Sequence, residues 1–234
     1  MNGPFSALCW IGRFGRVSFG AGAYLSFRYL GFRHFGRIER LLPSSGRILD
    51  LGCGHGLLAI LAAAASGSRE VFGIDLLERR LEVGREVARR HGVRNVRFER
   101  RDIQDPPAGP FDAIVVADVL FYRPVQAQRE LLEVLSARLR PGGRLLIKEQ
   151  VQEPAWKARL VAMQERLVVG MKVAVGGSSH WSRVAPSGIH LWHEESLEEA
   201  LRSLGLKPTT ERLDRWSWLS HRLFIAAAPA PRAR

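Results

Sequence analysis

Apolar and polar positions along the middle of the chain follow two periods, one typical of strands and one typical of helices. Short apolar runs predict strands at residues 47–51, 70–74, 94–99, 111–117 and 143–148. Between most of these runs, apolar residues recur at helical spacing, in segments 57–66, 77–91 and 125–139. Strands that alternate with helices predict a parallel sheet with right-handed crossovers.

The two ends of the chain follow other patterns. Beyond the fifth strand, we expect helices at 154–170 and 194–204 and two final strands at about 206–213 and 219–228. Pro141-Gly142-Gly143 is expected to stop the helix at 125–139 and to turn the chain into the next strand. Near the N-terminus, aromatic residues are interleaved with arginine and glycine, and each glycine weakens a helix by roughly 1 kcal/mol relative to alanine. A helix is still expected from Tyr24 to Leu42, packing over the main domain as part of an N-terminal helical cap.

These patterns divide the chain into one main domain and a cap. A chain of 234 residues with 46% hydrophobic content can bury one sizeable core. We assign residues 43–228 to that domain, with an insertion at 153–193, and expect residues 229–234 to be disordered. Residues 1–42 form a cap, which is either purely structural, a substrate lid or a segment that rests on lipid.

The loop Asp50-Leu51-Gly52-Cys53-Gly54-His55-Gly56 joins the first predicted strand to the first predicted helix. Glycines in such a turn tolerate positive φ and let a ligand approach the backbone closely. An acid at the strand end would repel a pyrophosphate, whereas it suits an ammonium or a sulfonium group. The loop therefore predicts a nucleoside cofactor that is cationic and not phosphorylated.

Further acids follow the next strands, at the sheet edge where open α/β sheets bind ligands. Asp75 can accept hydrogen bonds from both ribose hydroxyls, Asp102 can accept one from the adenine amine, and Asp118 lies beside the expected reacting centre. Two other cofactors are disfavoured. Leu57 stands where the dinucleotide fingerprint needs its third glycine, and no Gly-Lys-Ser/Thr sequence follows the loop to form a P-loop.

With these residues, the chain resembles the class I S-adenosylmethionine-dependent methyltransferases over roughly residues 35–228. The fourth strand with its acid, Phe111 to Leu120, and the turn Leu139 to Leu145 match the pattern of that family. The resemblance implies a Rossmann-like α/β fold, with a seven-stranded, mostly parallel sheet, helices on both faces and an antiparallel last strand. It also implies that S-adenosyl-L-methionine is the cofactor and that no metal is needed. The residues expected to bind the cofactor are Asp50, Gly52, Cys53, Gly54, Gly56, Asp75, Leu76, Asp102, Ile103, Ala117 and Asp118.

Catalysis by such a site depends mainly on alignment, because the sulfonium methyl group is already activated. A base is needed only if the acceptor must lose a proton. The candidates near the sheet edge and in the insertion are Asp118, Tyr122, Glu149 and His180, followed by His190 and His193. Most residues of this kind instead cap, pack or pair, so no catalytic residue is assigned from the sequence.

The methyl acceptor is expected to be apolar or aromatic, a small molecule or a lipid-like compound. Ala117-Asp118-Val119-Leu120-Phe121-Tyr122 replaces the Asn/Asp-Pro-Pro-Tyr/Phe tetrad of nucleic-acid amino methyltransferases. The cap and the insertion, which form the acceptor chamber in this family, are rich in aromatics that include Trp156, Trp181 and Trp192. Nucleic acid is therefore a disfavoured acceptor.

The charge of the chain keeps two alternatives open. The net charge is +12, of which residues 1–47 contribute +6 through seven arginines and one glutamate. This basic end could contact an anionic membrane or an acidic carrier protein, or the basic surface could bind RNA for an RNA methyltransferase. A cofactor-binding protein without turnover is a third possibility.

Cys9 and Cys53 lie too far apart in sequence to suggest a disulfide framework or a zinc site. With no signal peptide expected, a cytoplasmic location is expected, possibly at the inner membrane face.

Overall fold

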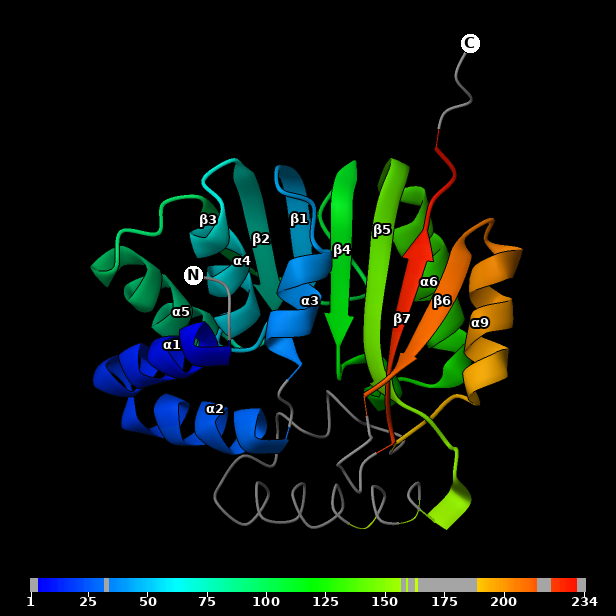
Figure 1. The fold of residues 1–234 in the computed structure, drawn as a ribbon, viewed down its shortest axis with the longest axis horizontal. Helices are drawn as coiled ribbons and strands as arrows, with labels where there is room; N and C mark the ends of the chain where they lie inside the picture. The colour runs from blue at the N-terminus through cyan, green and yellow to red at the C-terminus, as the bar shows by residue number, and fades with distance from the viewer. Residues whose placement is uncertain are drawn as a thin grey trace.

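A computed structural model of the protein describes residues 4–31, 34–156, 189–213 and 220–230, together with residues 159 and 163. These residues form a seven-stranded sheet with the strand order β3-β2-β1-β4-β5-β7-β6 (Figure 1). The strands are β1 (Gly46–Leu51), β2 (Arg69–Asp75), β3 (Val96–Arg100), β4 (Phe111–Ala117), β5 (Leu139–Gln150), β6 (Lys207–Arg212) and β7 (His221–Ala227). Strands β1 to β5 pair in parallel, and β7 is antiparallel to both of its neighbours. The predicted Rossmann-like sheet with an antiparallel last strand is confirmed.

Helices cover both faces of the sheet, which explains why the central strands are almost continuously apolar. On one face, the leucines of α6 (Val125–Ala137) and α9 (Glu194–Ser203) pack against Leu49, Val116 and Ile147. On the other face, α3 (Phe35–Leu41) and α4 (Leu57–Ala65) pack against Ile48, Val115 and Leu146. Helix α5 (Glu78–Arg90) packs beside α4 along β2 and β3.

The N-terminal residues form more helix than the sequence predicts. Helices α1 (Pro4–Val17) and α2 (Phe19–Gly31) lie beside the carboxyl ends of the strands (Figure 1), and α3 begins only at Phe35. The expected helical cap is confirmed, but the helix expected from Tyr24 to Leu42 is divided between α2 and α3, and the sequence pattern does not predict α1. The sequence-based expectation treats glycines only as helix breakers. Here they allow close helix packing, since a Cβ on Gly22 would stand 2.5 Å from the Cα of Gly15. The two glycines let α1 and α2 pack closely, and this contact offsets their low helix propensity.

Most other predicted elements agree with the structure, apart from the junction of α6 and β5. Helix α6 ends at Ala137, and Pro141-Gly142-Gly143 lies inside β5 and not in a turn before it. The pairing of β4 with β5 shifts register between Phe111 and Ala113 at this point. A Cβ on Gly143 would stand 2.8 Å from the Arg140 carbonyl oxygen, so the glycines serve an irregularity within the strand. Most of the helix predicted at 154–170 falls outside the described residues, as does the tail from residue 231.

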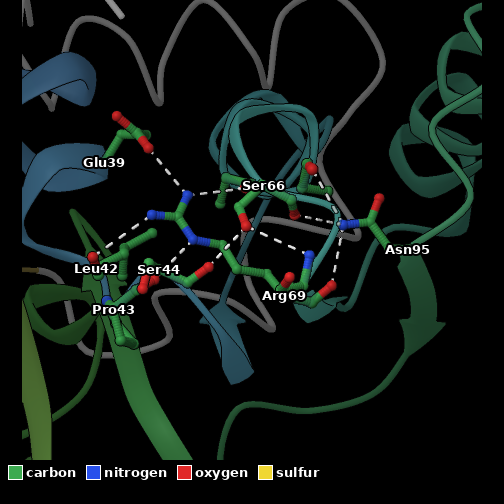
Figure 2. A network of polar contacts seen from close by, with 10 residues as sticks. Glu39, Leu42, Pro43, Ser44, Ser66, Arg69 and Asn95 are labelled. Atoms are coloured by element: carbon green, nitrogen blue, oxygen red, sulfur yellow. Dashed lines mark hydrogen bonds and ion pairs between the residues drawn. The ribbon is translucent and has the colours of Figure 1, made fainter.

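A buried arginine joins three elements at the opposite, amino edge of the sheet (Figure 2). Nη1 of Arg69, at the start of β2, donates to Glu39 Oε1 and to the Ala62 carbonyl oxygen, at 2.9 Å each. Its Nε donates to the Pro43 carbonyl oxygen at 2.8 Å. The Asn95 side-chain amide completes the network by donating to three carbonyl oxygens nearby. Arg69 thereby fixes the end of α3 and the end of α4 to the sheet.

Candidate active site

A cavity opens at the carboxyl ends of β1, β2 and β4, and residues of α2 line part of it. It is lined by every residue of the predicted cofactor-binding set except Gly56. Gly56 lies instead at the start of α4, where a Cβ would stand 2.3 Å from the ring of Phe98. Its role is to let the loop pack against β3. The cavity wall also contains residues that the sequence pattern did not single out, among them Tyr24, Leu25, Phe35, Arg80 and Arg123.

The glycine loop has the conformation that its sequence predicts. Gly52, Gly54 and Gly56 have φ values of 70°, 59° and 81°, in the left-handed region that favours glycine. The loop is tied to β2, because the Cys53 backbone N–H donates to the Ile74 carbonyl oxygen at 2.8 Å. A Cβ on Gly54 would meet no atom within 4 Å. At Gly54 the backbone is therefore open to a ligand.

Asp75 and Asp50 differ in how many of their hydrogen-bonding positions are used. The Asp75 carboxylate accepts from the backbone N–H groups of Gly54 and Leu77, at 2.9 Å each, one on each oxygen. Asp50 is buried, and its Oδ2 has no hydrogen-bond partner in the structure. Burial raises the pKa of Asp50 to about 7; the backbone of Ala59 opposes this shift and Asp75 adds to it. A cationic ligand in the cavity would supply the partner that Asp50 lacks, so these residues fit a cofactor with a cationic group.

Asp102, the expected partner of adenine, is already paired. Arg123, just after the short helix η1 (Leu120–Tyr122), donates from Nη2 to both Asp102 oxygens at 2.9 and 3.1 Å. The Asp102 carboxylate keeps further lone pairs toward the cavity. Sequence reasoning missed Arg123, because nothing in the local sequence relates it to an acid 21 residues earlier.

Asp118 belongs to a buried polar cluster at the ends of β4, β5 and β7. Its φ is 56°, which is rare for a residue other than glycine. Lys148 Nζ donates to Asp118 Oδ2 at 2.5 Å, and His221 Nε2 lies 3.6 Å from Asp118 Oδ1. The His34 ring lies 6.3 Å from that of His221. Burial, and to a smaller extent Lys148, lower the pKa of His34 to about 4, so this ring is neutral at neutral pH.

The structure separates the candidate catalytic residues. Asp118 and Tyr122 line the cavity. Glu149 lies behind it, where its Oε1 accepts from the backbone N–H groups of Val119 and Leu120 at 2.8 Å each. Burial and the nearby Asp118 raise the pKa of Glu149 to about 8. Glu149 therefore positions η1. The fourth candidate, His180, lies outside the described residues.

The aromatic residues expected in the acceptor chamber lie in different environments. Trp192 is buried in the core, where its Nε1 donates to Gln128 Oε1 at 2.5 Å. It therefore packs against α6 and does not line the cavity, contrary to the sequence-based expectation. Trp156 is exposed, and Trp181 lies outside the described residues. Among the described residues, Tyr24, Phe35 and Tyr122 line the cavity with phenyl or phenol rings, and His55 lines it with an imidazole.

Comparison with known proteins agrees with this geometry. A family model described as a methyltransferase domain matches residues 42–196. The ribosomal protein L11 methyltransferase of Dechloromonas aromatica is 37% identical over 120 residues, which cover 50% of this chain and 38% of that protein. The ubiquinone biosynthesis O-methyltransferase of Xanthomonas axonopodis pv. citri is 28% identical over 175 residues, which cover 72% of this chain and 65% of that protein. The chain thus spans less than two thirds of the length of these two curated relatives.

Solved structures share the fold at low sequence identity. The magnesium protoporphyrin IX methyltransferase of Synechocystis PCC 6803, solved with bound S-adenosylhomocysteine, superposes with a TM-score of 0.65 at 16% identity. The likeness covers 88% of this chain and 87% of that protein. The match of the family model spans two thirds of the chain and includes the glycine loop and all four acids at the strand ends. The chain belongs to the class I S-adenosylmethionine-dependent methyltransferases.

Proposed function

We propose that this protein transfers the methyl group of S-adenosylmethionine to an apolar or aromatic small molecule or a lipid-like acceptor. The observation that supports this proposal is the composition of the cavity. Its lining combines the open glycine loop, a carboxylate oxygen of Asp50 that has no hydrogen-bond partner among the described residues, and the aromatic rings of Tyr24, Phe35 and Tyr122. When bound, the cofactor supplies an activated methyl group. The task left to the chain is to align an acceptor with it.

Particular residues are proposed to hold the cofactor. Asp50 takes its cationic amino group, Gly54 leaves room beside the backbone, and Asp75 accepts from the ribose hydroxyls. Asp102, Leu76 and Ile103 bound the place for adenine. In support, the Asp50 oxygen has no other partner, and each Asp75 oxygen is fixed by one backbone N–H and keeps a lone pair for a ligand.

The acceptor is proposed to lie against Tyr24, Phe35 and Tyr122, next to Asp118. Aromatic rings bind a flat apolar molecule through buried area and stacking. The buried ion pair with Lys148 fixes the position of the Asp118 side chain. Asp118 can therefore accept a hydrogen bond from a hydroxyl or amine of the acceptor and orient it. Of the two curated relatives, the ubiquinone biosynthesis O-methyltransferase matches over the longer stretch, 175 residues against 120, which supports a small-molecule acceptor.

The test is to incubate the purified protein with methyl-labelled S-adenosylmethionine and three kinds of acceptor. These are phenolic and lipid-like small molecules, RNA, and ribosomal protein. The proposal expects label in the small-molecule fraction, and expects Asp118→Asn to lower kcat. Label in RNA or in protein would overturn the proposed acceptor class. Cofactor binding without transfer to any fraction would point to a protein without turnover.

We further propose that α1 and α2 bring the enzyme to an anionic membrane. Phe19, at the junction of the two helices, is 87% exposed, and Leu8 is 50% exposed. Arg13 and Arg16 lie on the same helix as Leu8. In the described part of the chain, no helix is long and apolar enough to cross a membrane, so such contact would be peripheral.

Vesicle binding tests this contact without disturbing the core. Phe19→Ser combined with Leu8→Ser should weaken co-sedimentation with vesicles that contain anionic lipid. Wild-type protein should bind neutral vesicles less tightly than anionic ones. Equal sedimentation of the variant and the wild type would remove this part of the proposal.

A further inference from the structure

Arg80 is a cation in the cavity wall, and none of the described residues is its anionic partner. It lies in α5, just beyond the end of β2, and its guanidinium is 5.4 Å from the centroid of the Tyr24 ring. Within the part of the chain that the structure describes, its side chain makes no ion pair and no hydrogen bond. The acids nearby are engaged elsewhere, since Asp102 pairs with Arg123 and Asp118 with Lys148. Arg80 is therefore available to an anion that enters the cavity.

A second unused polar group lies beside Arg80. The ring of His55, in the glycine loop, is 5.4 Å from that of Tyr24, so Tyr24 contacts both side chains. The His55 Nδ1 atom is buried and has no hydrogen-bond partner in the described part of the chain. Burial, and then the charge of Arg80, lower the pKa of His55 to about 4. The ring is neutral at neutral pH and can donate a hydrogen bond from one of its nitrogens.

Arg80 and the acids act on the same short stretch of the glycine loop. Burial, Asp50 and Asp75 raise the pKa of the Cys53 thiol, and Arg80 lowers it. All three charged groups therefore lie within electrostatic reach of the Cys53 side chain. Among the described residues, the cavity wall thus combines an acid oxygen without a partner, on Asp50 in the loop, with a cation without an ion pair, on Arg80 in α5. A ligand with an ammonium and a carboxylate on one carbon, which is an α-amino acid, has charges complementary to this pair.

We infer that Arg80 binds the α-carboxylate of the methionine part of the cofactor, with His55 as a second hydrogen-bond donor and Tyr24 holding the guanidinium in place. This inference rests on the proposed function, because it takes S-adenosylmethionine to be the ligand. Arg80 is then a positioning residue. By fixing the amino-acid end of the cofactor, it sets where the sulfonium lies relative to Asp118. Tyr24 belongs to α2, so the same contact joins the cap to the cofactor.

The test compares two ligands that differ only at the carboxylate. Isothermal titration calorimetry measures the affinity of each variant for S-adenosylmethionine and for decarboxylated S-adenosylmethionine, which keeps the sulfonium and the amine. Arg80→Gln should weaken binding of the complete cofactor about 10- to 100-fold. Binding of the decarboxylated ligand should change by less than about twofold, because it has no group for Arg80 to contact. Arg80→Lys should give an intermediate loss for the complete cofactor.

Arg79→Gln is the matched control, because Arg79 is the exposed neighbour on the same helix turn. It should bind both ligands like the wild type. Equal weakening of both ligands in Arg80→Gln, or the same loss in Arg79→Gln, would overturn the inference while leaving the proposed function intact. If wild-type protein bound neither ligand, the proposed function would fail and this inference with it. Thermal unfolding of each variant separates a lost contact from a lost fold.

Discussion

Asp50 combines burial with an oxygen that has no partner, a costly arrangement in a protein without a ligand. Part of this cost is avoided by protonation, because burial raises the pKa of its carboxyl to about 7. A cationic ligand would reverse the balance by favouring the charged form. At the scale of this one residue, we therefore expect cofactor binding to be coupled to proton release.

This coupling predicts a pH dependence of cofactor affinity. Only the ionised form of Asp50 pairs with a cation, so a proton must leave before the cofactor binds. As the pH falls below about 7, the affinity should drop by about tenfold for each pH unit. Calorimetric titrations between pH 5.5 and 8.5 measure the slope. Asp50→Asn should bind weakly at every pH with a flat profile, and an unchanged slope in that variant would assign the proton to another group.

At the scale of elements, the N-terminal helix pair depends on two glycines in contact. Gly15 and Gly22 bring α1 and α2 together, and α2 places Tyr24 and Leu25 in the cavity wall. The glycine loop needs its glycines for a different reason. Their positive φ values are required by the local turn, and this requirement can be read from the sequence. One set of glycines is used for backbone conformation and the other for closeness of packing.

Gly22→Ala tests the helix contact. Its new Cβ would stand 2.5 Å from the Gly15 Cα, so the helices must separate, at a cost of roughly 1–3 kcal/mol. Cofactor affinity should fall as well, because Tyr24 and Leu25 move with α2. Gly20→Ala is the control, since a Cβ there meets nothing within 4 Å and should stabilise α2 by up to about 1 kcal/mol. Urea unfolding and calorimetry measure both effects, and equal stabilisation by the two variants would contradict the packing argument.

At the scale of the whole molecule, the two edges of the sheet have different tasks. The carboxyl edge has the cavity with its unpartnered polar groups, and the amino edge has the satisfied network around Arg69. Strand β2 joins the two, and its seven residues separate Arg69 from Asp75 by about 20 Å. Stability and ligand binding should therefore respond separately to substitutions at the two edges.

Arg69→Met makes this separation measurable. It leaves Glu39 buried without its partner and should lower the free energy of unfolding by about 3–5 kcal/mol. Adding Glu39→Gln should recover part of the loss. The cofactor affinity of the folded variant, measured well below its unfolding temperature, should stay within about twofold of the wild type. A large loss of affinity would show that the two edges are coupled through β2.

The sequence predicts what depends on local pattern. The strands, the glycine loop and the acids at the strand ends all follow from periodicity and spacing within a few residues. It does not predict partners that are distant in sequence. Arg123 meets Asp102, Lys148 meets Asp118, and Arg80 meets Tyr24 only because the sheet and the cap bring them together. The same reason explains the error at α1 and α2, whose stability comes from packing against each other and not from propensity.

The position of β7 has a consequence for how the chain reaches this fold. Strand β6 precedes β7 in the chain, yet β7 lies between β5 and β6. During synthesis, the edge of β5 therefore exposes unpaired backbone groups until His221–Ala227 has been made. The exposed edge of β5 includes the apolar residues Leu145, Leu146 and Ile147. An apolar strand edge with unpaired backbone groups can pair with another chain. We expect aggregation during refolding to start at this edge, and to stop once β7 has paired with β5.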